Sequence, residues 1–165
     1  MDTSYYLEKF QEAADKLDKR LLTKKHVESA VVLYGKDCVV LKLYKRSWTN
    51  QFQDPLISKS RIFFSVWISD SSIKEEKLLY NIHALKLRQL KGYSIESRKF
   101  ADIFRDSFKL YKNKWKNVSL DFGPLTLMEG WLKIDIENFQ DEIIELANNF
   151  IEIEHLVDVT LAHFK

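Results

Sequence analysis

The stretch from Ser72 to Trp115 constrains the fold most, because its apolar residues predict amphipathic helices that must cover another layer. Ser72 and Glu75 have the spacing of a capping box, in which the serine and glutamate oxygens accept hydrogen bonds from each other's backbone amides. Five apolar residues then follow at helical spacing: Leu78, Leu79, Ile82, Leu85 and Leu90. They would share one face, so we expect a helix that runs to about Leu90.

Gly92 separates this helix from a second one, because glycine readily adopts the left-handed backbone that ends many helices. Ser94 or Ser97 can cap the next helix. Its apolar face is an aromatic stripe formed by Phe100, Ile103, Phe104, Phe108, Tyr111 and Trp115. A stripe of this width must be covered, and a β-sheet built from the preceding residues is the expected cover.

The preceding residues change their hydrophobic period from helical to alternating. Residues 4–22 carry apolar side chains at helical spacing and predict a first helix. Residues 27–34 and 39–43 alternate around a turn at Gly35, so they predict a hairpin. Residues 62–69 predict a third strand with aromatic side chains on both faces, which favours a central place in the sheet.

The last third of the chain predicts one or two more strands and a long final helix. Residues 118–122 fit a strand, and residues 125–136 fit either a strand or a helical turn after Pro124. From Asn138, which begins a capping-box-like sequence, helical spacing continues almost to the end. The expected fold is therefore a single α+β domain over 1–165, in the order α-β-β-β-α-α-β-(β)-α. We expect an antiparallel sheet of 4–5 strands with helices packed on one face.

Composition limits the classes of protein that this chain can join. A chain of 165 residues with 45% hydrophobic residues can fill one core, and 4 Gly with 2 Pro leave little length for loops. The only cysteine, Cys38, cannot form an intramolecular disulfide. We find no secretory signal and no apolar stretch of about 20 residues, so we expect a cytoplasmic protein without a membrane span.

The residues that carry chemistry form no recognisable motif. The four histidines are not spaced as metal ligands, the glycines do not cluster as a phosphate loop, and no nucleophile signature occurs. We therefore expect no catalytic residue, no metal and no cofactor. An enzyme would need a concave site that brings His83 together with an acid such as Asp70 or Glu129.

The element order of helix, three strands, helix and strand resembles the core of the PD-(D/E)xK nuclease superfamily. That resemblance implies an acid near the second strand and a Glu-x-Lys on the third, which together hold a metal. Asp37 matches the first position, but residues 61–67 contain no Glu-x-Lys, so a metal would lack its second carboxylate. The order is also similar to the type III secretion chaperone fold, a family of dimeric binding proteins.

Charge is unevenly distributed along the chain. The net charge is +3 over residues 1–73, +7 over 74–116 and −8 over 117–165. The basic middle can bind nucleic acid through cations and an aromatic side chain, namely Arg88, Lys91, Arg98, Lys99, Arg105, Lys112 and Trp115. Alternatively, the acidic last helix neutralises the basic segment, within one chain or across a two-fold dimer.

We expect a non-catalytic binding module of unknown partner that forms a homodimer. The last helix has an apolar arc broader than one sheet face needs, and the extra residues that could form the interface are Ile144, Ile151 and Leu156. A helix buried on two sides within a monomer would explain the same arc. The alternatives are a nucleic-acid-binding protein that uses residues 84–116 and a degenerate PD-(D/E)xK-like nuclease fold.

Overall fold

A computed structural model describes residues 1–135 and 137–165 and contains a five-stranded antiparallel sheet. Each strand pairs with the next one in the sequence, which confirms the α+β prediction and places the third strand at the centre. The strands are β1 (Glu28–Tyr34), β2 (Cys38–Tyr44), β3 (Arg61–Ser69), β4 (Lys77–Leu85) and β5 (Thr126–Lys133).

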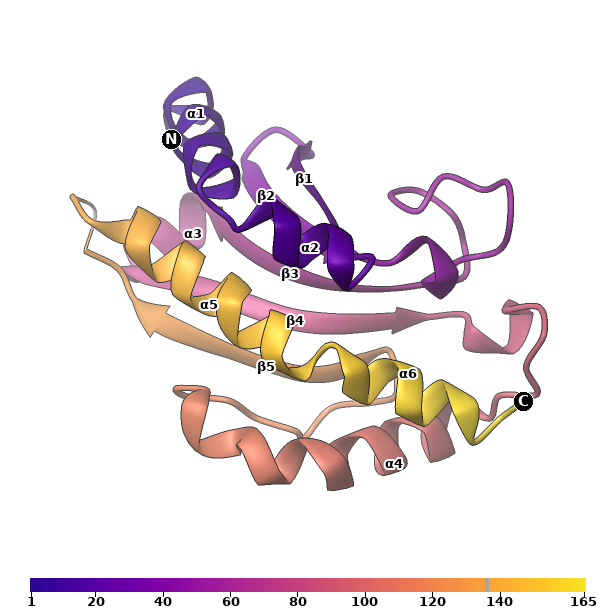
Figure 1. Ribbon diagram of the computed structural model, residues 1–165. Coiled ribbons are helices and arrows are strands. Elements are labelled where there is room, and N and C mark those ends of the chain that lie inside the picture. Colours follow the sequence, from indigo (N-terminus) through magenta and orange to yellow (C-terminus); the bar gives the residue numbers. More distant parts are fainter. Residues whose placement is uncertain (136) are drawn as a thin grey trace.

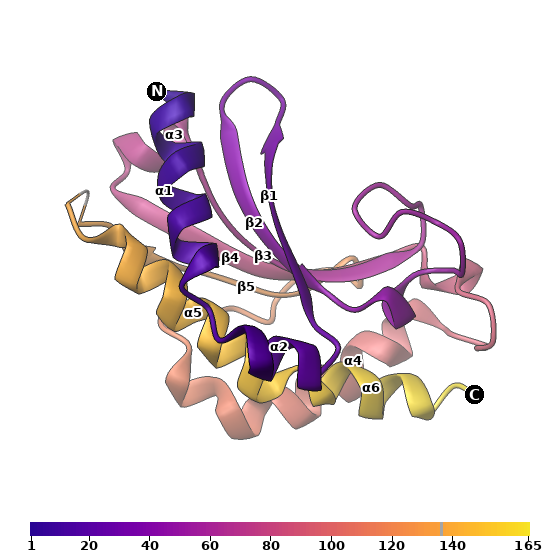
Figure 2. The same cartoon turned by 45° about the horizontal axis from the view of Figure 1, so that its top comes forward.

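Of the helices in the described residues, the five named next lie on one face of this sheet (Figure 1). They are α1 (Thr3–Asp15), α2 (Lys19–Lys24), α4 (Ser97–Phe108), α5 (Phe139–Ile153) and α6 (His155–Ala162). The short helix α3 (Asp70–Lys74) connects β3 to β4, and the 3-10 helices are η1 (Arg46–Trp48), η2 (Leu87–Gln89) and η3 (Lys109–Lys114). Figure 2 shows the β1–β2 hairpin rising beside α1, while α5 and α6 run along the sheet toward the C-terminus. No helix among the described residues is both long and apolar enough to span a membrane.

The core lies between the sheet and these helices and is rich in aromatic rings. Phe64 of β3 stacks on Phe150 of α5 with 4.6 Å between ring centroids. Trp48 meets the same phenylalanine edge to face, and Trp115 packs against Phe64. All four side chains are at most 3% exposed, so this cluster joins the middle of the sheet to the C-terminal helices.

The prediction of a helix over residues 78–90 is wrong, because this segment forms β4 and η2. Leu78, Tyr80, Ile82 and Ala84 alternate toward the helices and are fully buried. β3 and β5 pair with the segment on its two sides and supply the backbone hydrogen bonds of a strand. This pairing outweighs the helical spacing of its apolar residues. The capping box forms earlier than expected, between Ser69 and Ser72, and caps the short α3.

Several other boundaries also differ from the sequence prediction. The first helix is interrupted, because Asp18 caps a separate α2 and its carboxylate accepts hydrogen bonds from the backbone amides of Arg20 and Leu21. Residues 118–122 contribute a single bridge at Ser119 instead of a strand. β5 confirms the strand alternative for 125–136 and ends at Lys133, while position 136 lies outside the described residues. Asn138 makes no side-chain cap bond, although α5 begins directly after it.

A register shift between Ile82 and His83 shapes one end of the β4–β5 pair. Ile82 pairs with Met128, whereas His83 pairs with Thr126, so Leu127 is an extra residue in β5. Bulges of this kind redirect neighbouring side chains. Here the shift brings the backbone of Leu125 within reach of the His83 ring, with 3.3 Å between the ring Nδ1 and the carbonyl oxygen.

Candidate functional site

The face of the sheet opposite the five helices contains a hollow of about 400 Å³, which we call the sheet hollow. Strand alternation points Lys42, Phe63 and His83 to this face, because their neighbours Leu41, Phe64 and Ile82 are fully buried on the helix side. The remaining lining residues come from four strands and are Tyr34, Cys38, Val40, Arg61, Ser65, Trp67, Asn81 and Leu85.

A row of polar residues crosses this face from β2 to β5, and we call it the polar row. Lys42 is the register partner of Ser65, Ser65 of Asn81, and Asn81 of Glu129. The Ser65 hydroxyl donates to Asn81 Oδ1 at 2.5 Å, and Asn81 Nδ2 donates to Glu129 Oε1 at 3.2 Å. Ser65 and Asn81 are only 3% and 2% exposed, so the middle of the row is buried and fixed in orientation.

Asn81 also fixes the proton on His83. Its amide nitrogen faces the Glu129 carboxylate and lies 2.9 Å from His83 Nε2, so Nε2 accepts a hydrogen bond and carries no proton. The proton then sits on Nδ1 and points to the Leu125 carbonyl. Burial lowers the pKa of His83; the Leu125 carbonyl and Glu129 act in the opposite direction, and the nearby Lys42 and Arg61 lower it further. A neutral imidazole fits this arrangement.

Two cations of the hollow, Lys42 and Arg61, lie over the ring of Phe63. Lys42 Nζ is 4.6 Å from the ring centroid, and the Arg61 guanidinium carbon is 5.2 Å from it. Lys42 is 9% exposed and forms no salt bridge within the described part of the chain. Burial lowers the pKa of Lys42, and the repulsion of Arg61 lowers it further. Neither Lys42 nor Arg61 forms a salt bridge with a carboxylate of the described residues. Burial lowers the pKa of Arg61, and the charge of Asp54 partly offsets that effect.

The groups in the sheet hollow do not form a catalytic relay. The Ser65 hydroxyl contacts the Asn81 carbonyl oxygen and not the imidazole, and the lone pair of His83 Nε2 is already occupied. An amide between a serine and a histidine cannot pass a proton between them. Burial raises the pKa of the Cys38 thiol, and Asp37 adds to that rise, which keeps the thiol protonated and weakly nucleophilic. This geometry is suited to holding a ligand.

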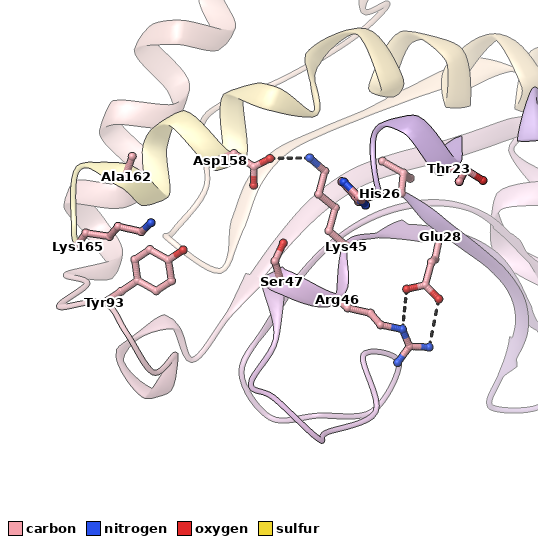
Figure 3. A pocket seen from close by; sticks show the side chains of 11 residues that line it. Thr23, His26, Glu28, Lys45, Arg46, Ser47, Tyr93, Asp158, Ala162 and Lys165 are labelled. Atoms are coloured by element: carbon pink, nitrogen blue, oxygen red, sulfur yellow. Dashed lines mark hydrogen bonds and ion pairs between the residues drawn. The ribbon is translucent and has the colours of Figure 1, made fainter. Parts of the chain in front are cut away.

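A second, larger hollow of about 830 Å³ lies between the end of β2 and α6 (Figure 3). Lys45 enters it and pairs with the buried Glu154 and with Asp158, 2.6 Å from Asp158 Oδ2. Asp158 also accepts a hydrogen bond from the Trp48 indole at 2.8 Å. Burial alone would lower the pKa of Lys45, but hydrogen bonds to Asp158 and Glu154 offset it and leave the pKa above its ordinary value. These groups balance one another and join β2 to α6.

The residues at the mouth of this second hollow are also paired. Arg46 and Glu28 form a two-pronged ion pair at the surface, with 2.8 Å between Arg46 Nε and Glu28 Oε2 (Figure 3). The arginine side chain is 69% exposed, so the pair contributes little to stability. We therefore assign the second hollow a structural role and take the sheet hollow as the candidate site.

The residues predicted to bind nucleic acid divide into three groups. Arg88, Lys91, Arg98, Lys99 and Lys112 are exposed. Arg105 instead donates to four carbonyl groups, those of Phe122, Gly123, Thr126 and Leu127, and so organises the loop before β5. Trp115 is 3% exposed and packs on Phe64, Tyr80 and Phe108, which leaves no face of its indole open to a base.

The residues proposed for a dimer interface are largely used inside the chain. Ile151 and Leu156 are 2% and 7% exposed, and Ile144 is half-buried against the core. The expected neutralisation of the basic segment by the acidic helix occurs within one chain at Lys114 and Glu152, 2.9 Å apart between Nζ and Oε2.

The three acids named from the sequence lie in different places in the structure. Glu129 reaches His83 through Asn81, whereas Asp70 pairs with the N-terminal amine of Met1 at 3.2 Å. Asp37 is exposed in the β1–β2 turn. Within the two described ranges, no group of three His, Cys, Asp or Glu side chains could hold a metal ion.

Sequence reasoning did not select Lys42, Arg61, Ser65 or Asn81. Two signals point toward them: Lys42 stands between Leu41 and Leu43 in a strongly apolar strand, and the central strand has aromatic side chains on both faces. Comparisons with models of protein families, with curated proteins and with solved structures find no match to this chain, so its function has to be inferred from the geometry of the site.

Proposed function

We propose that the protein is a non-catalytic binding module whose ligand enters the sheet hollow. The observation that supports this best is the polar row, which is buried on a sheet face that none of the five helices covers. Burying polar and charged groups reduces stability unless they are fully paired, so an incompletely paired row in a concave site indicates a role in binding.

Cys38 provides a direct test, because it lines the sheet hollow and is the only cysteine in the chain. We would measure its alkylation by iodoacetamide with intact-protein mass spectrometry, alone and with two dyes that differ by one sulfonate. These are 1-anilinonaphthalene-8-sulfonate and the neutral N-phenyl-1-naphthylamine. Binding in the hollow slows alkylation, and Cys38→Trp, which fills the hollow, removes the fluorescence of the bound dye. If neither dye slows alkylation relative to the protein without dye, the proposal is refuted.

We propose another interface for the homodimer that the sequence led us to expect, namely the unpaired edge of β1. This strand has only β2 beside it, contains no lysine or proline to block pairing, and ends in Leu33 and Tyr34, which are 45% and 71% exposed. We propose that two copies pair antiparallel through these edges. Light scattering after size-exclusion chromatography tests this. Leu33→Lys is expected to give monomers, whereas Val159→Lys, at an exposed position of α6, should leave the dimer intact.

Nucleic-acid binding is a second candidate, supported by the exposure of Arg88, Lys91, Arg98, Lys99 and Lys112. Because phosphate contacts release counterions, binding of this kind weakens steeply as salt rises. Charge reversal at Arg98 and Lys112 together should abolish it. Binding of a labelled oligonucleotide that does not respond to salt would contradict this candidate.

A further inference from the structure

We propose that the sheet hollow recognises a small organic anion with a planar apolar body, its acidic group lying between Lys42 and Arg61. This inference rests on the proposed function and specifies the chemical class of its ligand.

The unbalanced positive charge is the first observation that points to an anion. Lys42 is more than nine-tenths buried, and its ammonium makes no hydrogen bond among the described residues. Arg61 donates one bond to the Ser58 carbonyl, while its buried Nε has no partner. An anionic group placed between the two side chains would supply the missing acceptors and offset their mutual repulsion.

Glu129 does not supply that balancing charge. It lies three strands away from Lys42 along the polar row, and strands about 4.8 Å apart place the two backbones roughly 14 Å from each other. Ser65 and Asn81 fill the space between them. The polar row is thus positive at its β2 end and ends in a carboxylate on β5, beyond the residues that line the hollow. This polarity orients a ligand with its acid toward Lys42 and disfavours a second acid near Glu129.

The walls of the hollow are suited to a flat apolar group. Phe63 forms the floor beneath both cations and its ring lies 5.3 Å from that of His83. Val40, Trp67 and Leu85 complete the apolar lining. A volume of about 400 Å³ is at the small end of the range for ligand pockets, so the ligand is a small molecule rather than a folded partner.

The two dyes form a matched pair for testing this inference, because only one carries a sulfonate. Lys42→Met and Arg61→Met remove a charge and keep most of the side-chain length. Lys77→Met is the control, because Lys77 also stacks on an aromatic ring, 4.5 Å from the centroid of Trp131, but has Glu75 as a partner and lies outside the hollow. Fluorescence titration gives each dissociation constant, and alkylation of Cys38 reports whether the dye occupies the hollow.

We expect the anionic dye to protect Cys38 and to bind wild type more tightly than the neutral dye. Lys42→Met and Arg61→Met should each weaken the anionic dye about tenfold or more, while neutral-dye affinity and the Lys77→Met control stay within about twofold of wild type. Equal affinity for both dyes, with Cys38 protected, would overturn this inference and leave the proposed function standing. Failure of both dyes to protect Cys38 would overturn both. Near-ultraviolet circular dichroism confirms that each variant is folded.

Discussion

Lys42 and Lys45 lie three residues apart on the same segment, are 9% and 8% exposed, and have opposite surroundings. Lys45 meets two carboxylates from α6 and its N-terminal boundary, whereas Lys42 meets the ring of Phe63 and no carboxylate in the part of the chain that is described. Burial acts on both, yet the pKa of Lys45 ends above its ordinary value and that of Lys42 ends below it. A buried lysine that pairs with carboxylates, such as Lys45, indicates a structural role. A buried lysine without a counter-ion, such as Lys42, indicates a ligand site.

Lys45→Met tests the difference between the two lysines most strongly, because it has the largest expected effect on stability. It would leave Glu154 buried without a cation and Asp158 without its shortest partner, so we expect a loss of about 3–5 kcal/mol in the free energy of unfolding. Because the Asp158 side chain is 43% exposed, the value should fall at the lower end of that range. Urea denaturation measures the loss, and a cost below that of Lys42→Met would contradict the assignment.

Ser65→Asp should give Lys42 the counter-ion that it lacks. Ser65 is the register partner of Lys42 on the open face, so an acid there faces the ammonium directly. A double-mutant cycle with Lys42→Met should give a favourable coupling energy of about 2 kcal/mol, and the variant should no longer bind the anionic dye. Ser65→Asn has the same size without the charge and serves as the control. Retained dye binding in Ser65→Asp would argue against an anion site at Lys42.

Lys42→Met should change the free energy of unfolding less than Lys45→Met does, and should not lower it. The substitution removes a desolvated charge without orphaning a carboxylate, but it also removes the cation–π contact with Phe63. We expect unfolding free energy to stay unchanged or to rise by up to about 1 kcal/mol at pH 7. A clear loss of stability would show that Lys42 supports the fold and would weaken its assignment to a ligand.

The smallest expected effect is a pH dependence from His83. Its pKa lies below the ordinary value of 6.5, so between that value and the folded-state pKa the unfolded chain binds more protons than the folded one. Stability should therefore fall as pH drops through this window, and His83→Gln should flatten the curve. Thermal unfolding followed from pH 7 to pH 5 measures the slope. An equal slope in both proteins would show that His83 does not titrate as its environment indicates.

The hairpin and the central strand follow from local patterns. The helical end of the chain does too, although it is divided at Glu154 into α5 and α6 where one helix is predicted. β4 does not follow from such a pattern. Leu78, Leu79, Ile82 and Leu85 fit a helical face, but Leu78 and Ile82 also fit an alternating pattern with Tyr80. Tyr80 decides between them through tertiary structure: its ring lies against Gly130 of β5, where a Cβ atom would come within 2.2 Å of its hydroxyl oxygen. Such a fit between distant residues leaves no periodic signal in the sequence.

The candidate site was less predictable than the fold, because its parts come from four strands. His83 and Glu129 are named from the sequence as groups that a site would gather, but Asn81 between them is not. The cations in residues 84–116 are noticeable in the sequence because they are numerous. Lys42 is distinguished instead by having no salt bridge among the described residues, which the sequence does not show. Pairing between charges depends on register across strands, and composition does not encode register.

The pair between Lys45 and Asp158 also has a consequence for synthesis of the chain. The two residues are 113 positions apart, so β2 leaves the ribosome long before the carboxylates that neutralise its buried ammonium. Until they arrive, closing the core over Lys45 is unfavourable, so we expect this end of the N-terminal half to close late. We therefore expect the core at this end to close only once α6 can supply its carboxylates.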